Sequence, residues 1–230
     1  MSKKSGKAVR LLLVGSRGRM GREIQSLLRE DSTFNLAGTV NETPDWKACD
    51  PGNVDLVVEF SSLGGFEAAL RWCLRHRKPL VSGTTGLKAT QTKALRKAAR
   101  TLPILYSANM SLGIAVLCTM LESLAAVRDW DFQIEEAHHS RKKDRPSGTG
   151  LLLESKLEEA IQRQLPPTQS IRGGGIPGIH QVWAMGPEET LILQHTAFNR
   201  TVFARGALTA ARWLFDKNRP GLYDLKDLYQ

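Results

Sequence analysis

Near its start the chain contains the feature that most constrains its fold, a short apolar segment that runs into a glycine-rich turn. Residues 8–15 are β-rich, and the turn that follows reads Gly15-Ser16-Arg17-Gly18-Arg19-Met20-Gly21. Apolar residues then recur at helical spacing at Met20, Ile24, Leu27 and Leu28. A strand, a glycine-rich turn and a helix in this order are the context that a dinucleotide-binding loop requires, because glycine lets the backbone approach a pyrophosphate and the helix start attracts it. A tight turn without a ligand is the alternative.

The strand and helix pattern continues along the first half of the chain. We predict strands at 34–40, 55–60, 79–82 and 104–106, with helices at 66–75 and 89–99. Strands and helices that alternate at this length indicate βαβ units and a parallel sheet, whose ligands bind at the carboxyl ends of the strands. The pattern changes after Asn109, where an apolar helix is predicted at 114–127, a strand at 131–137 and a helix at 151–164. Strands at 180–184 and 189–197 and a helix at 202–215 complete the prediction.

The sequence therefore predicts an α/β protein with two domains. The first is a Rossmann-type dinucleotide-binding domain formed by residues 1–109 and 204–230. The second, residues 110–203, is a mixed α+β domain for substrate binding and oligomerisation. Its strands at 180–197 carry apolar residues on both faces, so each face needs a cover. The helix after Gly148 could cover one face and a neighbouring subunit the other, which favours a closed homo-oligomer.

The most unusual stretch is residues 135–150, which read EEAHHSRKKDRPSGTG. His138 and His139 can exchange protons near neutral pH, and Lys142 adds a compact positive charge. The sequence Pro146-Ser147-Gly148-Thr149 opens a helix, whose free backbone N–H groups bind anions such as carboxylates. A solvated polar surface is the first alternative for a His pair and a basic run. A zinc site is the second, but adjacent side chains on a strand point to opposite faces and no HExxH or CxxC motif accompanies them. We therefore predict no metal, and a loop that holds and protonates an acidic small molecule.

The composition leaves nucleic acid as a rival partner, because the net charge is +9 and the pI about 9.7. The positive charges are scattered, with no run of five Lys or Arg, and an acidic substrate with a phosphate-bearing cofactor accounts for the excess equally well. We predict no nucleic-acid partner and no membrane association, since the longest apolar helix is too short to span a bilayer. An odd number of widely spaced cysteines fits a reducing compartment, so the predicted location is cytoplasmic.

Residues 136–149 resemble a known signature. They match every fixed position of E-x-H-H-x-x-K-x-D-x-P-S-G-T, which is typical of the dihydrodipicolinate reductase family. The resemblance extends over essentially the whole chain, through the glycine-rich turn, the GTTG string at 83–86, ANMSLG at 108–113 and the segments at 172–180 and 200–207. The chain departs from the family pattern at Asn41, where an acidic residue is usual, and Glu59, where Asp is usual. Met110 replaces an aromatic residue and Ile179 a Glu.

The resemblance implies reduction of 4-hydroxy-tetrahydrodipicolinate or dihydrodipicolinate by NADPH or NADH, in the diaminopimelate route to lysine. It implies that His138 is the general acid and that Lys142 shares the catalytic work. The implied substrate-binding residues are His139, Gly148, Thr149 and Arg200. The implied cofactor-binding residues are Gly15, Arg17, Gly18, Arg19, Met20, Asn41, Phe60, Gly83, Thr84, Thr85, Ala108, Asn109 and Met110. It also implies a homotetramer built through the sheet of the second domain. Asp144 is expected to order Lys142 or the loop rather than to take part in chemistry.

The cofactor prediction depends on Asn41. An acid after the second strand normally binds the ribose hydroxyls and repels a 2′-phosphate, whereas Asn can bind a hydroxyl without that repulsion. Arg17 and Arg19 add positive charge in the neighbouring turn, although Glu42 could restore a preference for NADH. We expect both cofactors to work, with NADPH equal or somewhat better. Two alternatives stay open: another Rossmann oxidoreductase similar to aspartate dehydrogenase, and a dinucleotide sensor without catalysis.

Overall fold

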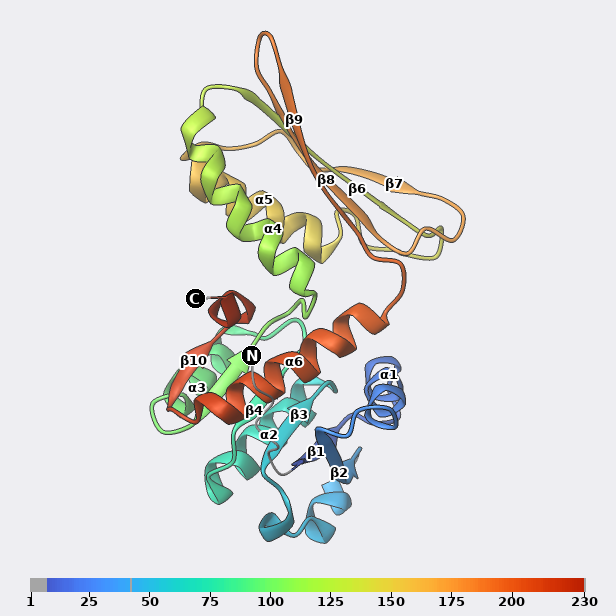
Figure 1. Ribbon diagram of the computed structural model, residues 1–230, viewed down its shortest axis with the longest axis vertical. Helices are drawn as coiled ribbons and strands as arrows, with labels where there is room; N and C mark the ends of the chain where they lie inside the picture. The colour runs from blue at the N-terminus through green and yellow to red at the C-terminus, as the bar shows by residue number, and fades with distance from the viewer. Residues whose placement is uncertain (1–7, 42, 230) are drawn as a thin grey trace. The chain divides into compact units, whose positions relative to one another are not determined.

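The computed structural model describes residues 8–41 and 43–229 (Figure 1). The chain divides into two compact units: one comprises the residues up to Met110 and those from Phe203 onward, and the other is Ser111–Val202. The α/β class predicted from the sequence is confirmed. The assignment of one unit to the cofactor and the other to the substrate stays a prediction. Within the described ranges, no helix combines the length and apolar character needed to cross a membrane.

The first unit contains a six-stranded sheet in the order β10-β5-β4-β3-β1-β2, with all neighbours parallel. Its strands are β1 (Val9–Val14), β2 (Phe34–Val40), β3 (Leu56–Glu59), β4 (Leu80–Ser82), β5 (Pro103–Tyr106) and β10 (Gly221–Tyr223). Its helices are α1 (Arg19–Leu28), α2 (Leu63–His76), α3 (Ala89–Ala98) and α6 (Thr201–Lys217), with short 3-10 turns at Thr43–Ala48, Pro51–Asn53 and Leu225–Tyr229. The predicted order of strands and helices is confirmed up to β5.

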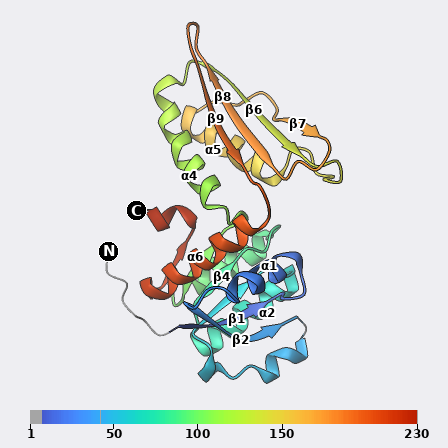
Figure 2. The ribbon, with the colours of Figure 1, turned by 45° about the vertical axis from the view of Figure 1, so that its right-hand side comes forward.

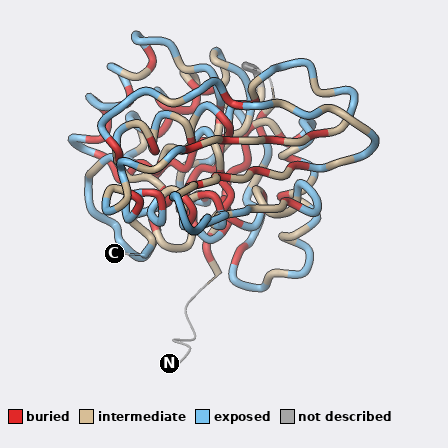
Figure 3. Tube along the Cα trace, turned by 90° about the horizontal axis from the view of Figure 1, so that it is seen from above, coloured by how far each residue is buried: buried red, intermediate tan, exposed pale blue. Residues whose placement is uncertain are grey.

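Strands buried on both faces explain the apolar runs in this half of the sequence. On one face, Leu12 and Val57 pack in a single cluster with Phe66 of α2 and Leu95 of α3. Leu13, which points to the opposite face of β1, is equally buried. Figure 2 shows the helices placed along the sheet in a second view, and Figure 3 shows how buried and exposed stretches alternate along the chain.

The second unit contains a four-stranded sheet in the order β7-β6-β8-β9. Its strands are β6 (Asp131–His138), β7 (Gln169–Arg172), β8 (Ile179–Met185) and β9 (Thr190–Thr196), and β7 alone pairs in parallel, with β6. The helices α4 (Leu112–Glu122) and α5 (Gly148–Ile161) cover one face of the sheet (Figure 1). Their apolar side chains, such as Leu117 and Leu157, pack against Ile134 and Val182. The prediction that the helix after Gly148 covers this sheet is confirmed.

One sequence prediction needs correction, and two short strands lie where none was predicted. The helix predicted at 114–127 is α-helical only to Glu122 and ends in a 3-10 turn, Ser123–Val127. The strands β7 and β10 were not predicted from the sequence. Each has at most four residues and pairs only through its neighbour, β6 or β5, so neither produces a periodic pattern of its own.

Candidate active site

The glycine-rich turn between β1 and α1 brings backbone segments too close together for side chains. Gly15 has φ +87°, and a Cβ on it would lie 2.2 Å from the carbonyl oxygen of Phe60. A Cβ on Gly21 would lie 2.2 Å from the carbonyl oxygen of Gly15. Gly18 is the N-cap of α1, and neither a capping side chain nor an acidic residue occupies the first turn. A helix start of this kind, with Arg17 and Arg19 exposed beside it, fits an anionic pyrophosphate.

Asn41 closes this turn from the end of β2. Its Oδ1 accepts hydrogen bonds from the Ser16 hydroxyl at 3.1 Å and from the backbone N–H of Arg17 at 2.9 Å. The backbone N–H of Asn41 donates to the carboxylate of Asp45 at 2.7 Å, so an acidic side chain stands near this strand end after all. Glu42, which was expected to compete for the same role, lies outside the described residues.

The other predicted cofactor residues follow β3, β4 and β5 at the same edge of the sheet. Thr85 and Ala108 are exposed there, Gly83 and Asn109 are half-buried, and Thr84 and Met110 are buried. A Cβ on Gly83 would lie 2.1 Å from the Phe60 ring, so the ring packs directly over this glycine.

Glu59 at the end of β3 connects these loops, a role that sequence reasoning missed. Its carboxylate is fully buried and accepts hydrogen bonds from Ser61 (backbone N–H and hydroxyl, 2.7 and 2.5 Å), Ser82 (2.6 Å) and Thr84 (2.7 Å). Glu59 has one methylene more than the Asp that is usual at this position. Its longer side chain still receives hydrogen bonds from Ser61, Ser82 and Thr84. The signal in the sequence was an acidic residue within an otherwise apolar strand.

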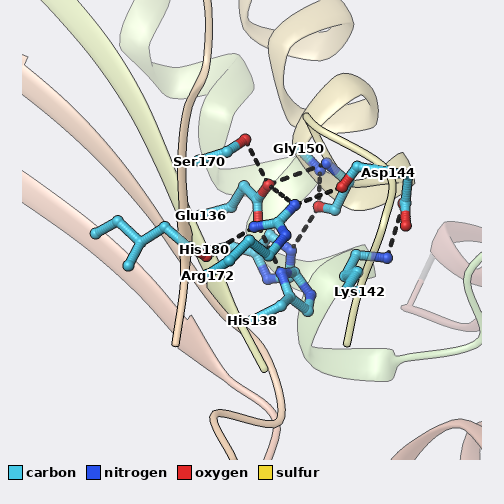
Figure 4. A network of polar contacts seen from close by, with 10 residues as sticks. Glu136, His138, Lys142, Asp144, Gly150, Ser170, Arg172 and His180 are labelled. Atoms are coloured by element: carbon cyan, nitrogen blue, oxygen red, sulfur yellow. Dashed lines mark hydrogen bonds and ion pairs between the residues drawn. The ribbon is translucent and has the colours of Figure 1, made fainter. Parts of the chain in front are cut away.

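The second unit gathers the predicted catalytic residue into a buried polar network (Figure 4). Alternating residues of β6 place Glu136 and His138 on the sheet face that α4 and α5 cover, and β8 adds His180 beside them. The Nδ1 atom of His138 lies 2.5 Å from Oε2 of Glu136. Arg172 at the end of β7 donates to both oxygens of Glu136, at 2.8 and 2.6 Å. A hydroxyl from Ser170 adds a further bond at 2.7 Å.

Burial and charge set the protonation states in this network. Burial would raise the pKa of Glu136, but hydrogen bonds from Arg172, Ser170 and His138 outweigh it and hold the pKa at about 2. Burial lowers the pKa of His138, although the hydrogen bond to Glu136 acts in the opposite direction. Burial also lowers the pKa of His180 to about 3, and the neighbouring His138 and His195 add to the effect. At neutral pH the network therefore holds an ionised carboxylate and a neutral His180.

Helix α5 begins at the edge of this network. Ser147 is its N-cap: the Ser147 hydroxyl accepts a hydrogen bond from the backbone N–H of Gly150 at 3.0 Å and lies 3.3 Å from Nε2 of His180. Gly148 is exposed and Thr149 half-buried at this start, and their role in binding an anion stays a prediction. The backbone N–H of Ser147 also donates to Glu136 at 3.1 Å, which ties the helix start to the same carboxylate.

The remaining predicted residues follow β6 or precede α6. Lys142 pairs with Asp144 at 2.7 Å, so the expectation that Asp144 orders Lys142 agrees with the structure. His139 follows the last residue of β6, and its Nδ1 is buried without a hydrogen-bond partner among the described residues. Arg200 is exposed in the turn before α6 and is not a member of the network. The described residues contain no cluster of three or more His, Cys, Asp or Glu that could hold a metal ion.

Sequence reasoning missed Arg172 as a partner of Glu136 and assigned His180 no function. Both residues stood out in the sequence only as the two ends of the segment at 172–180. His180 could be explained there as a polar residue at the start of a strand. Their burial depends on the pairing of β7 and β8 with β6, which no local pattern reveals.

Comparisons with known proteins agree with this architecture. The family model of the dihydrodipicolinate reductase N-terminus matches residues 9–110, and that of the C-terminus matches residues 113–229. A 4-hydroxy-tetrahydrodipicolinate reductase from Bdellovibrio bacteriovorus is 41% identical over 222 residues, which cover 96% of each chain. The enzyme of the same name from Xanthomonas euvesicatoria is 40% identical and covers 96% of this chain and 98% of its own.

Solved structures show the same fold. A dihydrodipicolinate reductase from Paenisporosarcina sp. TG-14, solved with dipicolinate bound, has a TM-score of 0.83 at 18% identity and covers 96% of this chain and 99% of its own. An aspartate dehydrogenase from Thermotoga maritima has a TM-score of only 0.50 at 12% identity, over 90% of this chain and 96% of its own. The two family models together span almost the whole sequence, and the relatives are about 40% identical over nearly their full length. The chain therefore belongs to the dihydrodipicolinate reductase family.

Proposed function

We propose that this protein reduces 4-hydroxy-tetrahydrodipicolinate, or its dehydrated form dihydrodipicolinate, to tetrahydrodipicolinate in the diaminopimelate route to lysine. One hydride and one proton add across a double bond of the ring, and a hydroxylated substrate also loses water. A bound nicotinamide supplies the hydride. The observation that carries the proposal is the buried Glu136–His138 pair next to the start of α5, in a chain of this family. A proton donor beside a helix start that can bind an anion is what the proposed reaction requires.

We assign the first unit to the cofactor and the second to the substrate. The turn at Gly15, Arg17, Gly18, Arg19 and Met20 would hold the pyrophosphate, and the loops after β3, β4 and β5 would line the rest of the dinucleotide. The proton donor in the second unit is His138. The backbone N–H groups of Gly148 and Thr149 would bind one carboxylate, with Lys142, His139 and Arg200 providing positive charge or donors for the other. The dipicolinate in the related solved reductase supports a dicarboxylate substrate.

We propose that both NADPH and NADH are used, with NADPH equal or somewhat better. The Oδ1 atom of Asn41 accepts hydrogen bonds from the turn, and the side chain carries no charge, so it does not repel a 2′-phosphate. Arg17 and Arg19 are exposed and can bind a phosphate group. Asp45 opposes this preference, because its carboxylate bonds the backbone of Asn41 at the same strand end. The ratio of kcat/KM for the two cofactors measures the balance.

We propose a homotetramer that forms through the open face of the second unit's sheet. The strand register places Trp183 of β8 directly beside Ile192 of β9, on the face opposite the helices. Ile192 is 47% exposed, and Ile171, which pairs with Ala137 on the same face, is 55% exposed. Apolar side chains on an uncovered sheet favour association. A monomeric mass by light scattering at micromolar concentration would contradict this proposal.

The test of the function is oxidation of NADPH and NADH with substrate freshly generated by the lyase that precedes it. We expect turnover with both cofactors and none without the substrate. An aspartate dehydrogenase would instead reduce NAD⁺ with aspartate, and a dinucleotide sensor would bind cofactor without any turnover.

The free cysteines at 49, 73 and 118 suit the reducing cytoplasm in which we place the enzyme.

A further inference from the structure

Glu136 stands at the centre of the buried network, and its surroundings determine how His138 is protonated (Figure 4). Only 1% of Glu136 is exposed, and the side chain of Arg172 is 2% exposed. Besides His138, four hydrogen bonds reach the carboxylate: two from Arg172, one from the Ser170 hydroxyl and one from the backbone N–H of Ser147. The guanidinium of Arg172 and the backbone N–H of Ser147 can only donate, and the Ser170 hydroxyl donates as well, so the network favours the ionised form of Glu136.

An ionised carboxylate at this position fixes the tautomer of His138. Nδ1 lies 2.5 Å from an oxygen that can only accept, so Nδ1 carries the proton in the neutral ring. The atom that gains and loses a proton is then Nε2. It faces Gly178, where a Cβ would lie 3.2 Å from Nε2, so the missing side chain leaves room at this atom.

We propose that Glu136 is a positioning residue for proton transfer, which holds His138 in the tautomer that donates from Nε2, and that Arg172 keeps Glu136 ionised. The proton leaves Nε2 for the substrate, and the ring remains neutral with its proton on Nδ1. The proposal rests on the proposed role of His138 as the general acid. It also explains why the helix start belongs to the network, because the same carboxylate orients the proton donor and the N-cap residue Ser147.

A purely structural ion pair is the competing explanation, since Glu136 and Arg172 would then only stabilise the sheet. The two explanations differ in the titration of His138. The charged and titratable groups around it are Glu136 on β6, Arg172 on β7, His180 on β8 and Lys142 in the loop after β6. Glu136 is the only one of these four that favours the imidazolium. Its neutralisation should therefore move the alkaline limb of the pH profile, where activity falls as His138 loses its proton, to lower pH.

The first measurement reads the tautomer in the wild-type protein and uses a variant only to assign the signal. Two-bond ¹H–¹⁵N correlation spectra of the wild-type protein report which ring nitrogen is protonated, and the signal that disappears in H138Q identifies His138. We expect the Nδ1–H tautomer at pH values above the pKa of His138. A neutral ring protonated at Nε2 would overturn the proposal, whatever the stability of any variant.

The second measurement is the pH profile of kcat for Glu136→Gln, with Glu135→Gln as the matched control. Glu135 is the next residue on the same strand, but its carboxylate accepts from Trp183 Nε1 at 3.0 Å, on the opposite face of the sheet. We expect E136Q to lower kcat roughly 10²–10³-fold and to shift the profile to lower pH, while E135Q changes neither. In the H138Q background, E136Q should lower kcat no further, because the residue acts through His138.

The outcomes separate this inference from the proposed function. Near-normal turnover of H138Q would overturn the proposed function and the inference together. A large loss in H138Q, combined with an E136Q profile that coincides with that of E135Q, would overturn the inference alone. Independent and multiplicative losses from E136Q and H138Q would overturn it as well.

Discussion

His180 makes the stability of the second unit depend on pH. Its side chain is buried, with 4% of the residue exposed, and burial lowers its pKa from 6.5 to about 3. At pH values between these two pKa values, His180 is therefore protonated in the unfolded chain and neutral in the folded chain. The resulting stability is complete above pH 6.5 and is lost as the pH falls toward 3. Between pH 7 and pH 4 the loss from this residue amounts to about 3 kcal/mol.

The substitution His180→Gln isolates this contribution. Gln can accept a hydrogen bond from the Ser147 hydroxyl in place of Nε2 of His180, but it does not titrate. Glu136, His138 and His195 also have lowered pKa values, so acid destabilises both proteins, and the difference between the two belongs to His180. Native-state hydrogen exchange of the β8 and β9 amides, with urea unfolding curves, measures the free energy of opening at pH 7 and pH 4.

We expect H180Q to be less stable than the wild type at pH 7, because the imidazole fits its packed site, but to lose about 3 kcal/mol less between pH 7 and pH 4. The m-values should agree, which shows that both proteins expose the same surface on unfolding. Equal losses in the two proteins would refute the reasoning, since they would mean that burial does not keep His180 neutral.

Four further predictions concern the site and the assembly. His138→Gln should lower kcat by roughly 10²–10⁴-fold with little change in cofactor affinity, measured by steady-state kinetics and cofactor fluorescence titration. Lys142→Ala should raise the transition-state barrier by several kcal/mol and weaken inhibition by pyridine-2,6-dicarboxylate. In the wild type, the corresponding monocarboxylate should inhibit far less than the dicarboxylate does. Asn41→Asp should weaken NADPH more than NADH, and a wild-type preference for NADH above about tenfold in kcat/KM would contradict the assignment. Ile192→Glu should lower the mass seen by light scattering, because it places a charge on the proposed interface.

The sequence by itself determined the order of the main elements and the position of the motifs. Strand β2 lies at the predicted residues 34–40, and the glycine-rich turn connects a strand and a helix as expected. These features are local: alternating or periodic side chains, a glycine with φ +87° and a Ser N-cap are set by neighbours within a few residues. The family could be identified for the same reason, since its signatures are continuous strings.

Only the tertiary structure decided which side chains work together. Glu136 meets Arg172 across a separation of 36 residues, through a four-residue strand that gave no signal in the sequence. The role of Asn41 as a brace of the turn, and the presence of Asp45 beside it, likewise depend on how the segment after β2 folds back. A hydrogen bond between distant residues depends on strand register, and a lowered pKa depends on burial, and both are properties of the packed chain rather than of any short segment of it.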